Sequence, residues 1–112
     1  MEIDVLFTGV PVSSLESGAD FFGRLFGRPA DVRVNDGEVM WLLADAAWLY
    51  VVVDPARCGQ GLAAVSVPDL DAALRELASR GISPETVEQV GGGRKATVHD
   101  PDGNTVAVIE VP

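Results

Sequence analysis

The chain has 112 residues, 47% of them hydrophobic, and its eight basic and 17 acidic residues give a net charge of −9. This length favours one domain with a single core, and the charge disfavours nucleic acid and anionic membrane surfaces as partners. The longest apolar stretches fall well short of the roughly 20 residues that cross a bilayer. The acidic start is unlike a secretory signal, and the single cysteine, Cys58, excludes an internal disulfide. We therefore expect a soluble cytoplasmic protein.

The first half of the chain predicts a strand, a capped helix and three short strands. Residues 3–12 are mostly apolar and predict the first strand. Ser13 and Glu16 have the spacing of a capping box, and Gly27 and Pro29 end the helix that follows. The buried stripe of this helix is expected at Leu15, Ala19, Phe22 and Phe26. Residues 32–34, 39–43 and 48–53 predict strands, and a hairpin turn is expected at residues 35–37.

The second half of the chain repeats this order. Pro68 and Asp69 open a helix that ends at Gly81. Its buried stripe is expected at Leu70, Ala73, Leu74 and Leu77. Residues 86–90, 95–98 and 105–111 predict strands, with a tight turn at residues 100–104 before the last one. We expect Asp100 and Asp102 to cap their own backbone within that turn.

The two halves also share identical residues at a spacing of 55. The first-half members are Val10, Val12, Leu15, Pro29, Val32, Gly37, Asp45, Val51 and Val53. The repeat predicts an α+β fold of two βαβββ modules, at about residues 1–56 and 57–112, within one domain spanning residues 1–112. The modules are related by a pseudo-twofold, and their helices cover the outer face of curved mixed sheets.

This arrangement resembles the vicinal oxygen chelate superfamily, which includes glyoxalase I, the extradiol dioxygenases, and the fosfomycin and bleomycin resistance proteins. The resemblance is carried by three segments, residues 12–27, residues 67–71 and the turn Asp100-Pro101-Asp102-Gly103-Asn104. It implies that the modules curl around a cleft and that a small single-domain member forms a homodimer. It also implies a divalent metal in the cleft of most enzymes of the group. The fold alone does not fix the reaction.

The metal positions implied by this resemblance carry no metal ligands in this chain. Counting from the shared motifs, they fall on Phe7, Val52, Leu62 and Ala107, which pair between the modules at the same spacing of 55. None of these side chains offers oxygen, nitrogen or thiolate to a divalent ion. We therefore expect neither a metal nor another cofactor.

Strand alternation places an apolar, aromatic-lined surface on the concave face. The expected ligand contacts are Phe7, Trp48, Tyr50, Val52, Leu62, Ser66, Thr105, Ala107 and Ile109. Tyr50 can donate a hydrogen bond, and Trp48 and Phe7 can stack on a planar or cationic ligand. The alternative is that these aromatic residues simply fill the cleft or a dimer interface.

Two further residues are candidates for polar contacts. His99, the only histidine, has a side chain suited to general-base chemistry, and Arg94 follows three glycines that are suited to a lid. The alternative for His99 is that it only ends a strand beside a turn. The alternative for Arg94 is that it is an exposed charge that aids solubility. Cys58 has no histidine near it in sequence, so the residues do not favour a nucleophilic role for its thiol.

These features favour a metal-free homodimer that sequesters or senses an apolar or aromatic small molecule, as the bleomycin resistance proteins do. Its partners would be this ligand and a second copy of the chain. Whether it is an enzyme stays open, although the apolar residues at the usual metal positions favour a binding protein. One alternative is a glyoxalase- or dioxygenase-type enzyme with a non-standard metal site, or with acid–base chemistry from His99 and Tyr50. Another is a structural or partner-binding domain whose cleft is filled by its own side chains.

Overall fold

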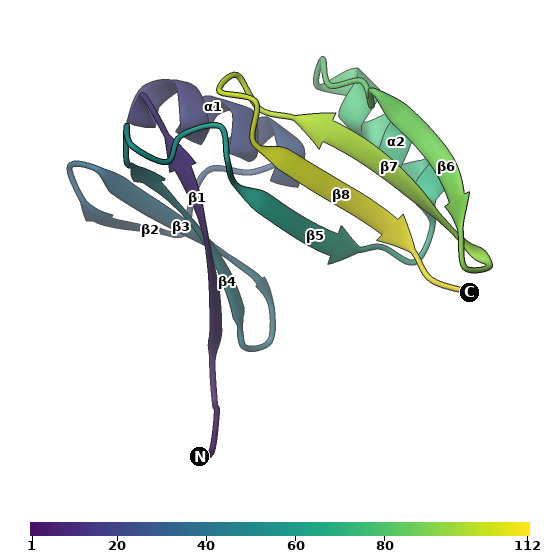
Figure 1. The fold of residues 1–112 in the computed structure, drawn as a ribbon, viewed down its shortest axis with the longest axis horizontal. Helices are drawn as coiled ribbons and strands as arrows, with labels where there is room; N and C mark the ends of the chain where they lie inside the picture. The colour runs from purple at the N-terminus through teal and green to yellow at the C-terminus, as the bar shows by residue number, and fades with distance from the viewer.

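Two βαβββ modules follow one another in the computed structural model, which describes residues 1–112 (Figure 1). The first module comprises β1 (Leu6–Val12), α1 (Leu15–Phe26), β2 (Val32–Asn35), β3 (Glu38–Ala44) and β4 (Ala47–Val53). The second comprises β5 (Leu62–Ser66), α2 (Leu70–Ser79), β6 (Thr86–Val90), β7 (Gly93–His99) and β8 (Thr105–Glu110). The element order agrees with the sequence, although β1 begins three residues later than predicted.

Each module folds into its own four-stranded mixed sheet. The strand orders are β1-β4-β3-β2 and β5-β8-β7-β6, so the first and last strands of each module lie side by side. Those two strands are parallel, whereas the other neighbours are antiparallel. The helices lie over one face of the sheets, and β1 and β5 are free edges (Figure 1). The predicted α+β fold is confirmed.

The registers of the two modules correct the spacing inferred from the sequence. Phe7 of β1 pairs with Trp48, while its counterpart Leu62 of β5 pairs with Thr105. The first strands therefore correspond at a spacing of 55 residues, but the last strands correspond at 57. The counterpart of Ala107 is thus Tyr50, and the predicted pairing of Ala107 with Val52 is wrong. A constant spacing cannot describe modules whose connecting loops differ in length.

Both helices begin at side-chain caps, as their sequences predict, but the first cap is one residue further on. Ser14 is the N-cap of α1, and its hydroxyl accepts a hydrogen bond from the Ser17 amide at 3.3 Å. Asp69 caps α2 in the same way, through the Ala72 amide. Gly27 ends α1 with a φ of 77°, a left-handed conformation that favours glycine. Ser13 has a different role, described below.

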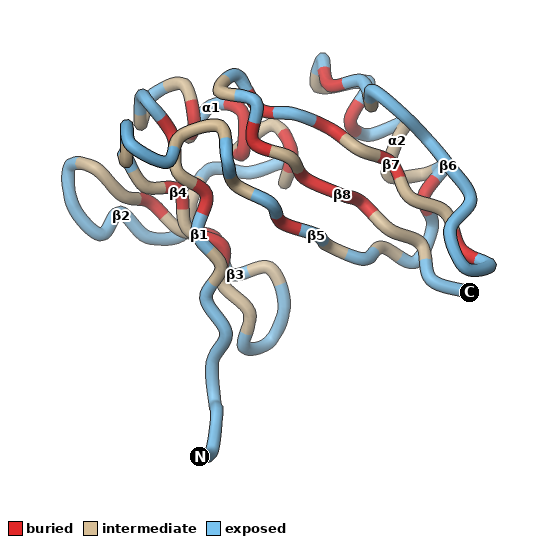
Figure 2. Tube along the Cα trace, in the orientation of Figure 1, coloured by how far each residue is buried: buried red, intermediate tan, exposed pale blue.

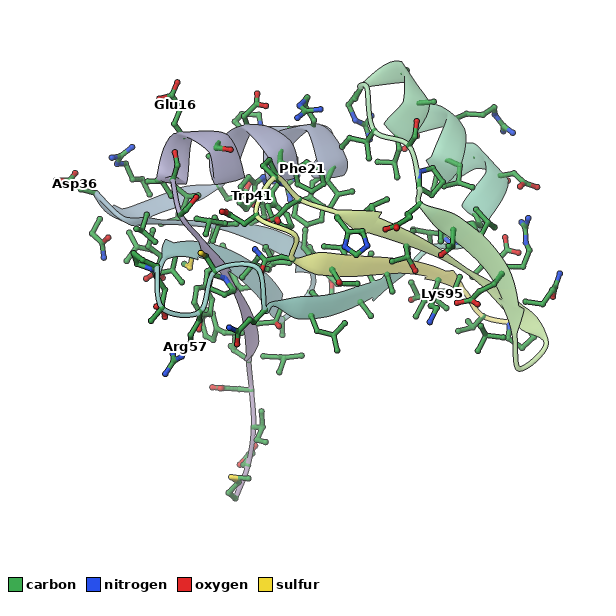
Figure 3. The ribbon with its side chains drawn as sticks, turned by 45° about the horizontal axis from the view of Figure 1, so that its top comes forward. Glu16, Phe21, Asp36, Trp41, Arg57 and Lys95 are labelled. Atoms are coloured by element: carbon green, nitrogen blue, oxygen red, sulfur yellow. The ribbon has the colours of Figure 1, made fainter.

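The core lies between the helices and the sheet faces beneath them (Figure 2). At its centre the fully buried Trp41 contacts the rings of Phe22 and Phe26, and its indole nitrogen donates to the carbonyl of Arg28 at 3.0 Å. Trp41 lies beneath α1, while Glu16 points away from it into solvent (Figure 3). The core is continuous across both modules and includes Leu77, Ile82, Val98 and Val106 of the second.

One asparagine side chain joins the modules. Asn104 is fully buried, its Nδ2 donates to the carbonyl of Pro11 at 2.7 Å, and its Oδ1 accepts from the amide of Gly61 at 2.6 Å. It thereby connects the end of β1 to the start of β5. Asp100 confirms its predicted role by accepting the amides of Asp102 and Asn104 within its own turn.

Asp102 differs from its predicted role of capping its own turn. Its carboxylate accepts the amide of Ser13 at 2.9 Å, which joins the last turn of the second module to the residue before the N-cap of α1. A second bridge lies at the opposite ends of the helices, where Arg80 donates to the carbonyls of Arg24 and Leu25. These carbonyls end α1, where a cation is electrostatically favoured. Polar contacts therefore fix the modules at both ends of α1.

Candidate functional site

Each sheet has one face without a helix, which we call its open face. Val10 and Val51 of the first sheet, and Val98 and Val106 of the second, point toward the helices and are buried. By strand alternation, the nine predicted ligand contacts point the other way. Their exposure differs widely, from 79% for Leu62 and 52% for Phe7 to 9% for Ala107.

The open face of the first sheet is mainly apolar and aromatic. Its paired rows are Phe7, Trp48 and Leu42, then Gly9, Tyr50 and Met40, then Pro11, Val52 and Glu38. The sequence analysis missed Leu42 and Met40, although the alternation of β3 would have identified them. The open face of the second sheet is more polar. Its rows are Leu62, Thr105 and His99, then Ala64, Ala107, Thr97 and Thr86, then Ser66, Ile109, Lys95 and Glu88.

Tyr50 lies against Gly9, the neighbouring residue of β1. A Cβ added to Gly9 would stand 2.4 Å from Cζ of Tyr50, so the ring occupies the space that any other residue would need. The ring is thus held across β1 toward the free edge of the sheet. Glycine at position 9 therefore sets the position of the only tyrosine in the chain.

Gly9→Ala is expected to displace the Tyr50 ring and to lower the free energy of unfolding by about 1–3 kcal/mol, as overpacking does. The NMR signals of the single tyrosine ring, together with urea unfolding, would measure both effects. Gly23→Ala is the matched control, because its added Cβ would meet nothing closer than 3.5 Å. If Gly9→Ala leaves the tyrosine signals unchanged, Gly9 does not set the position of the Tyr50 ring.

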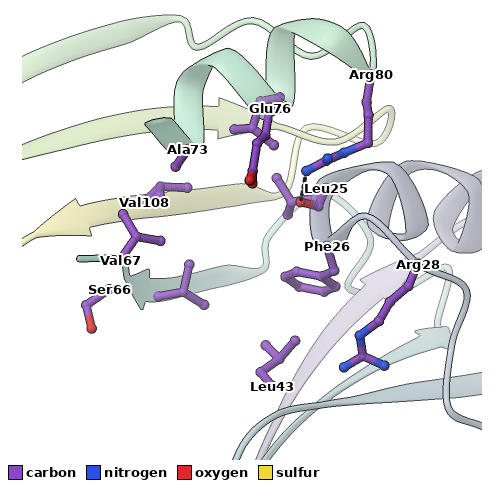
Figure 4. A pocket seen from close by; sticks show the side chains of 12 residues that line it. Leu25, Phe26, Arg28, Leu43, Ser66, Val67, Ala73, Glu76, Arg80 and Val108 are labelled. Atoms are coloured by element: carbon purple, nitrogen blue, oxygen red, sulfur yellow. Dashed lines mark hydrogen bonds between the residues drawn. The ribbon is translucent and has the colours of Figure 1, made fainter. Parts of the chain in front are cut away.

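Two cavities lie between the modules. The first, of about 300 Å³, lies between the end of α1, α2 and β5, and Arg28, Glu76 and Arg80 are its charged lining residues (Figure 4). The second, of about 250 Å³, is lined mainly by apolar residues of β1, β3, β4 and β5. They share Leu43, Val65 and Ser66, so they form one continuous groove. The sequence analysis missed this groove because it depends on how the modules pack.

The structure brings together only part of the predicted site within one chain. Trp48 and Ser66, from different modules, both line the second cavity. A third cavity lies beside α1 and is lined in part by His99. The other predicted ligand contacts line none of these three principal cavities; they are Phe7, Tyr50, Val52, Leu62, Thr105, Ala107 and Ile109. The two sheets extend away from each other beyond β1 and β5 (Figure 1), and Trp48 and Ser66 are the predicted ligand contacts that line a cavity shared by the two modules.

The two predicted polar contacts lie on opposite faces of the second sheet. Arg94 faces α2, where its guanidinium contacts Asp71 at 3.0 Å and Glu110 at 3.4 Å. It is therefore held by two carboxylates on the helix side. His99 is on the open face, 2.5 Å from a Glu85 carboxylate oxygen and 3.3 Å from the Thr105 hydroxyl. Lys95 also lies on the side of this sheet away from α2 (Figure 3).

The contact between Arg94 and Asp71 makes a pH-dependent contribution to stability. Hydrogen bonding to the Arg94 guanidinium lowers the pKa of Asp71 below its ordinary value of 3.8. A carboxyl whose pKa is lower in the folded state stabilises the fold above its unfolded pKa, and that stability is lost as the pH falls through the folded pKa. Asp71→Asn should thus be less stable than wild type at pH 7, and the difference should shrink as the pH falls below 3.8 and disappear below the folded-state pKa of Asp71.

Urea unfolding at a series of pH values would measure this difference. Asp45→Asn serves as the control, because Asp45 is exposed and has no ion-pair partner. A stability difference for Asp71→Asn that persists unchanged in acid would show that the ion pair is not its source.

Comparison with known proteins assigns the chain to a family. Residues 4–108 match the family described as Glyoxalase/Bleomycin resistance protein/Dioxygenase superfamily. The chain belongs to this superfamily. No curated protein sequence matches it. Neither helix is long and apolar enough to span a membrane.

Solved structures of the superfamily superpose along nearly the whole chain. A glyoxalase/bleomycin resistance protein from Catenulispora acidiphila is 33% identical, with a TM-score of 0.91 and coverage of 96% of this chain and 98% of that one. TnmS3, an antibiotic-binding protein from Streptomyces, is 25% identical, with a TM-score of 0.80 and coverage of 100% of this chain and 99% of that one. A bleomycin-binding protein complexed with bleomycin shares the fold. It is 24% identical, with a TM-score of 0.79 and coverage of 98% of this chain and 100% of that one.

The positions at which superfamily enzymes are expected to hold a metal do not form a ligand set in this chain. Phe7, Leu62 and Ala107 are apolar, and the register makes Tyr50 the fourth position in place of Val52. A phenol is then the only oxygen donor among them, whereas a divalent ion needs several ligands. His, Cys, Asp and Glu side chains also form no group of three suited to a metal elsewhere in the chain. The residues present do not fit a metal.

Proposed function

We propose that this superfamily member is a metal-free protein that binds an apolar or aromatic small molecule, by sequestration or sensing. The observation that carries the proposal is the chemistry of the open faces, where Phe7, Tyr50, Leu62 and Ala107 stand at the positions expected for metal ligands. Apolar surfaces with a few polar groups are typical of small-molecule sites. Two structural relatives, an antibiotic-binding protein and a bleomycin-binding protein, support the same function.

We further propose that the site is completed by a second copy of the chain. The free edges of β1 and β5 carry exposed apolar side chains, among them Leu6 at 64% and Leu62 at 79% exposure. Free edges with exposed apolar residues favour pairing with another chain. A homodimer in which β1 of one copy meets β5 of the other would place an aromatic open face opposite a polar one.

Two alternatives have less support in the geometry. An enzyme using His99 and Tyr50 would need both at one site, but they lie on different sheets and share none of the principal cavities. A domain that fills its own cleft would cover the predicted contacts, yet Phe7 and Leu62 remain exposed. The net charge of −9 also disfavours nucleic acid as a partner.

Leu62→Lys tests the dimer and the site together. It should convert the dimer to a monomer and abolish ligand binding while the circular dichroism spectrum stays native, because it places a charge on the free edge of β5. Val87→Lys is the matched control, since Val87 is an exposed apolar residue at 48% on the opposite edge strand, β6. Sedimentation velocity measures the oligomeric state. A wild-type protein that sediments as a monomer contradicts the shared site.

The proposed absence of a metal can be tested by measuring the metal content of the protein. Protein purified without chelators should contain less than about a tenth of an equivalent of any transition metal by plasma mass spectrometry, because the expected positions lack donors. A near-stoichiometric metal would refute this part. Thermal-shift screening with apolar and aromatic compounds would then identify ligands, and failure of every compound would count against binding.

A further inference from the structure

Three polar side chains of the second module contact one another in series, with the imidazole of His99 between Glu85 and Thr105. His99 ends β7 and pairs directly with Thr105, the first residue of β8. The imidazole Nε2 lies 2.5 Å from the Glu85 carboxylate, and Nδ1 lies 3.3 Å from the Thr105 hydroxyl. We call Glu85, His99 and Thr105 the relay. No side chain of the relay takes part in the junction between the modules or in the core.

The chemistry of the groups sets the direction of the relay when the imidazole is neutral. The Glu85 carboxylate beside Nε2 favours the tautomer that carries its proton on that nitrogen. Nδ1 then has a lone pair, to which the Thr105 hydroxyl donates a hydrogen bond. Both lone pairs of the Thr105 oxygen are then free to accept. The relay therefore presents a hydrogen-bond acceptor at the start of β8.

The surroundings of the relay narrow the kind of donor that it would accept. Lys95 lies two rows further along the same face and contacts the Glu88 carboxylate at 3.5 Å, so it offers no unpaired cation to a ligand. In the proposed dimer, the first sheet of the second copy supplies Phe7, Trp48 and Tyr50, which suit an aromatic ring. A phenolic hydroxyl combines a neutral donor with such a ring.

We propose that the relay anchors a phenolic hydroxyl of an aromatic ligand, which donates a hydrogen bond to the hydroxyl oxygen of Thr105. The aromatic ring lies against the apolar open face contributed by the first module of the second copy. This inference rests on the proposed binding function with its shared dimer site, and it adds the ligand's polar group and its orientation. Thr105 contacts the ligand, whereas His99 and Glu85 are positioning residues that hold the hydroxyl in its accepting orientation.

A pair of probes that differ in one hydrogen-bond donor tests the anchor. 2-Naphthol and 2-methoxynaphthalene present the same ring system, but only 2-naphthol can donate. By isothermal titration calorimetry, wild-type protein should bind 2-naphthol about five- to tenfold more tightly, as expected for one neutral hydrogen bond. Thr105→Val, which keeps the side-chain shape, should remove this preference, and Thr105→Ser should retain it. His99→Phe should reduce it.

Thr86→Val is the matched control, because Thr86 lies on the same open face but outside the relay. It should keep the preference of the wild type. Equal affinity of wild-type protein for the two probes would overturn the anchor and leave the proposed binding function standing. If neither probe binds, aromatic binding itself fails and the anchor fails with it. A preference that survives in Thr105→Val would also overturn the proposal.

Discussion

Asn104→Ala is expected to lower the free energy of unfolding by about 2–4 kcal/mol, because it leaves hydrogen-bonding groups unpaired at the junction of the modules. The substitution removes the partners of the Pro11 carbonyl and the Gly61 amide at once. It also removes a contact with the carboxylate of Asp100, at 2.7 Å. Since the side chain is fully buried, water cannot replace these bonds without opening the junction. Urea unfolding of the purified variant would measure the loss.

Asn35→Ala is the matched control for this prediction. Asn35 is exposed in the turn between β2 and β3, and its side chain accepts only the amide of Gly37 within the same turn. Its loss should cost about 1 kcal/mol or less. If the two variants are equally stable, Asn104 does not hold the modules together as the structure indicates.

Trp41→Ala is expected to lower the free energy of unfolding by about 3–5 kcal/mol, the range for removing a large aromatic side chain from a core. Trp41 is fully buried, and its ring packs against Phe22 and Phe26, with ring centroids at 6.3 Å and 5.6 Å. The substitution also leaves the carbonyl of Arg28 without its indole donor. Denaturant unfolding would measure the effect, and the variant should have the lowest stability of those considered.

Trp48→Ala provides the comparison, because it removes the only other tryptophan. Trp48 is half-buried beside the second cavity, so its loss should cost less stability and affect ligand binding more. If Trp48→Ala lost more stability than Trp41→Ala, and Trp41→Ala affected ligand binding more, the assignment of Trp41 to the core and Trp48 to the site would be contradicted.

Local chemistry in the sequence determined the elements of the fold. Helical spacing, the cap at Asp69 and the glycine at position 27 predicted both helices, because each signal depends on residues within one or two turns. Alternation likewise separated the buried Val10 and Val51 from the outward Phe7 and Tyr50. These signals, repeated in both halves, were sufficient to predict the family and the α+β architecture.

Contacts distant in sequence were decided only by the tertiary structure. Asp102 has the local pattern of a turn residue, yet its carboxylate accepts the amide of Ser13, 89 residues away. Asn104 similarly connects Pro11 with Gly61. The counterpart of Ala107 depended on strand register, and it proved to be Tyr50 because the last strands correspond at a spacing of 57 residues.

The site shows the same division. The residue types alone indicated that the expected metal positions lack ligands. Strand alternation, which assigns a face to each residue, indicated that Trp48, Tyr50 and Phe7 form an aromatic surface. Which surfaces meet depends on how the modules pack, and that packing is set by contacts between residues far apart in the chain. Only the structure could therefore show the diverging sheets, the groove between the modules and the contacts that join Glu85, His99 and Thr105.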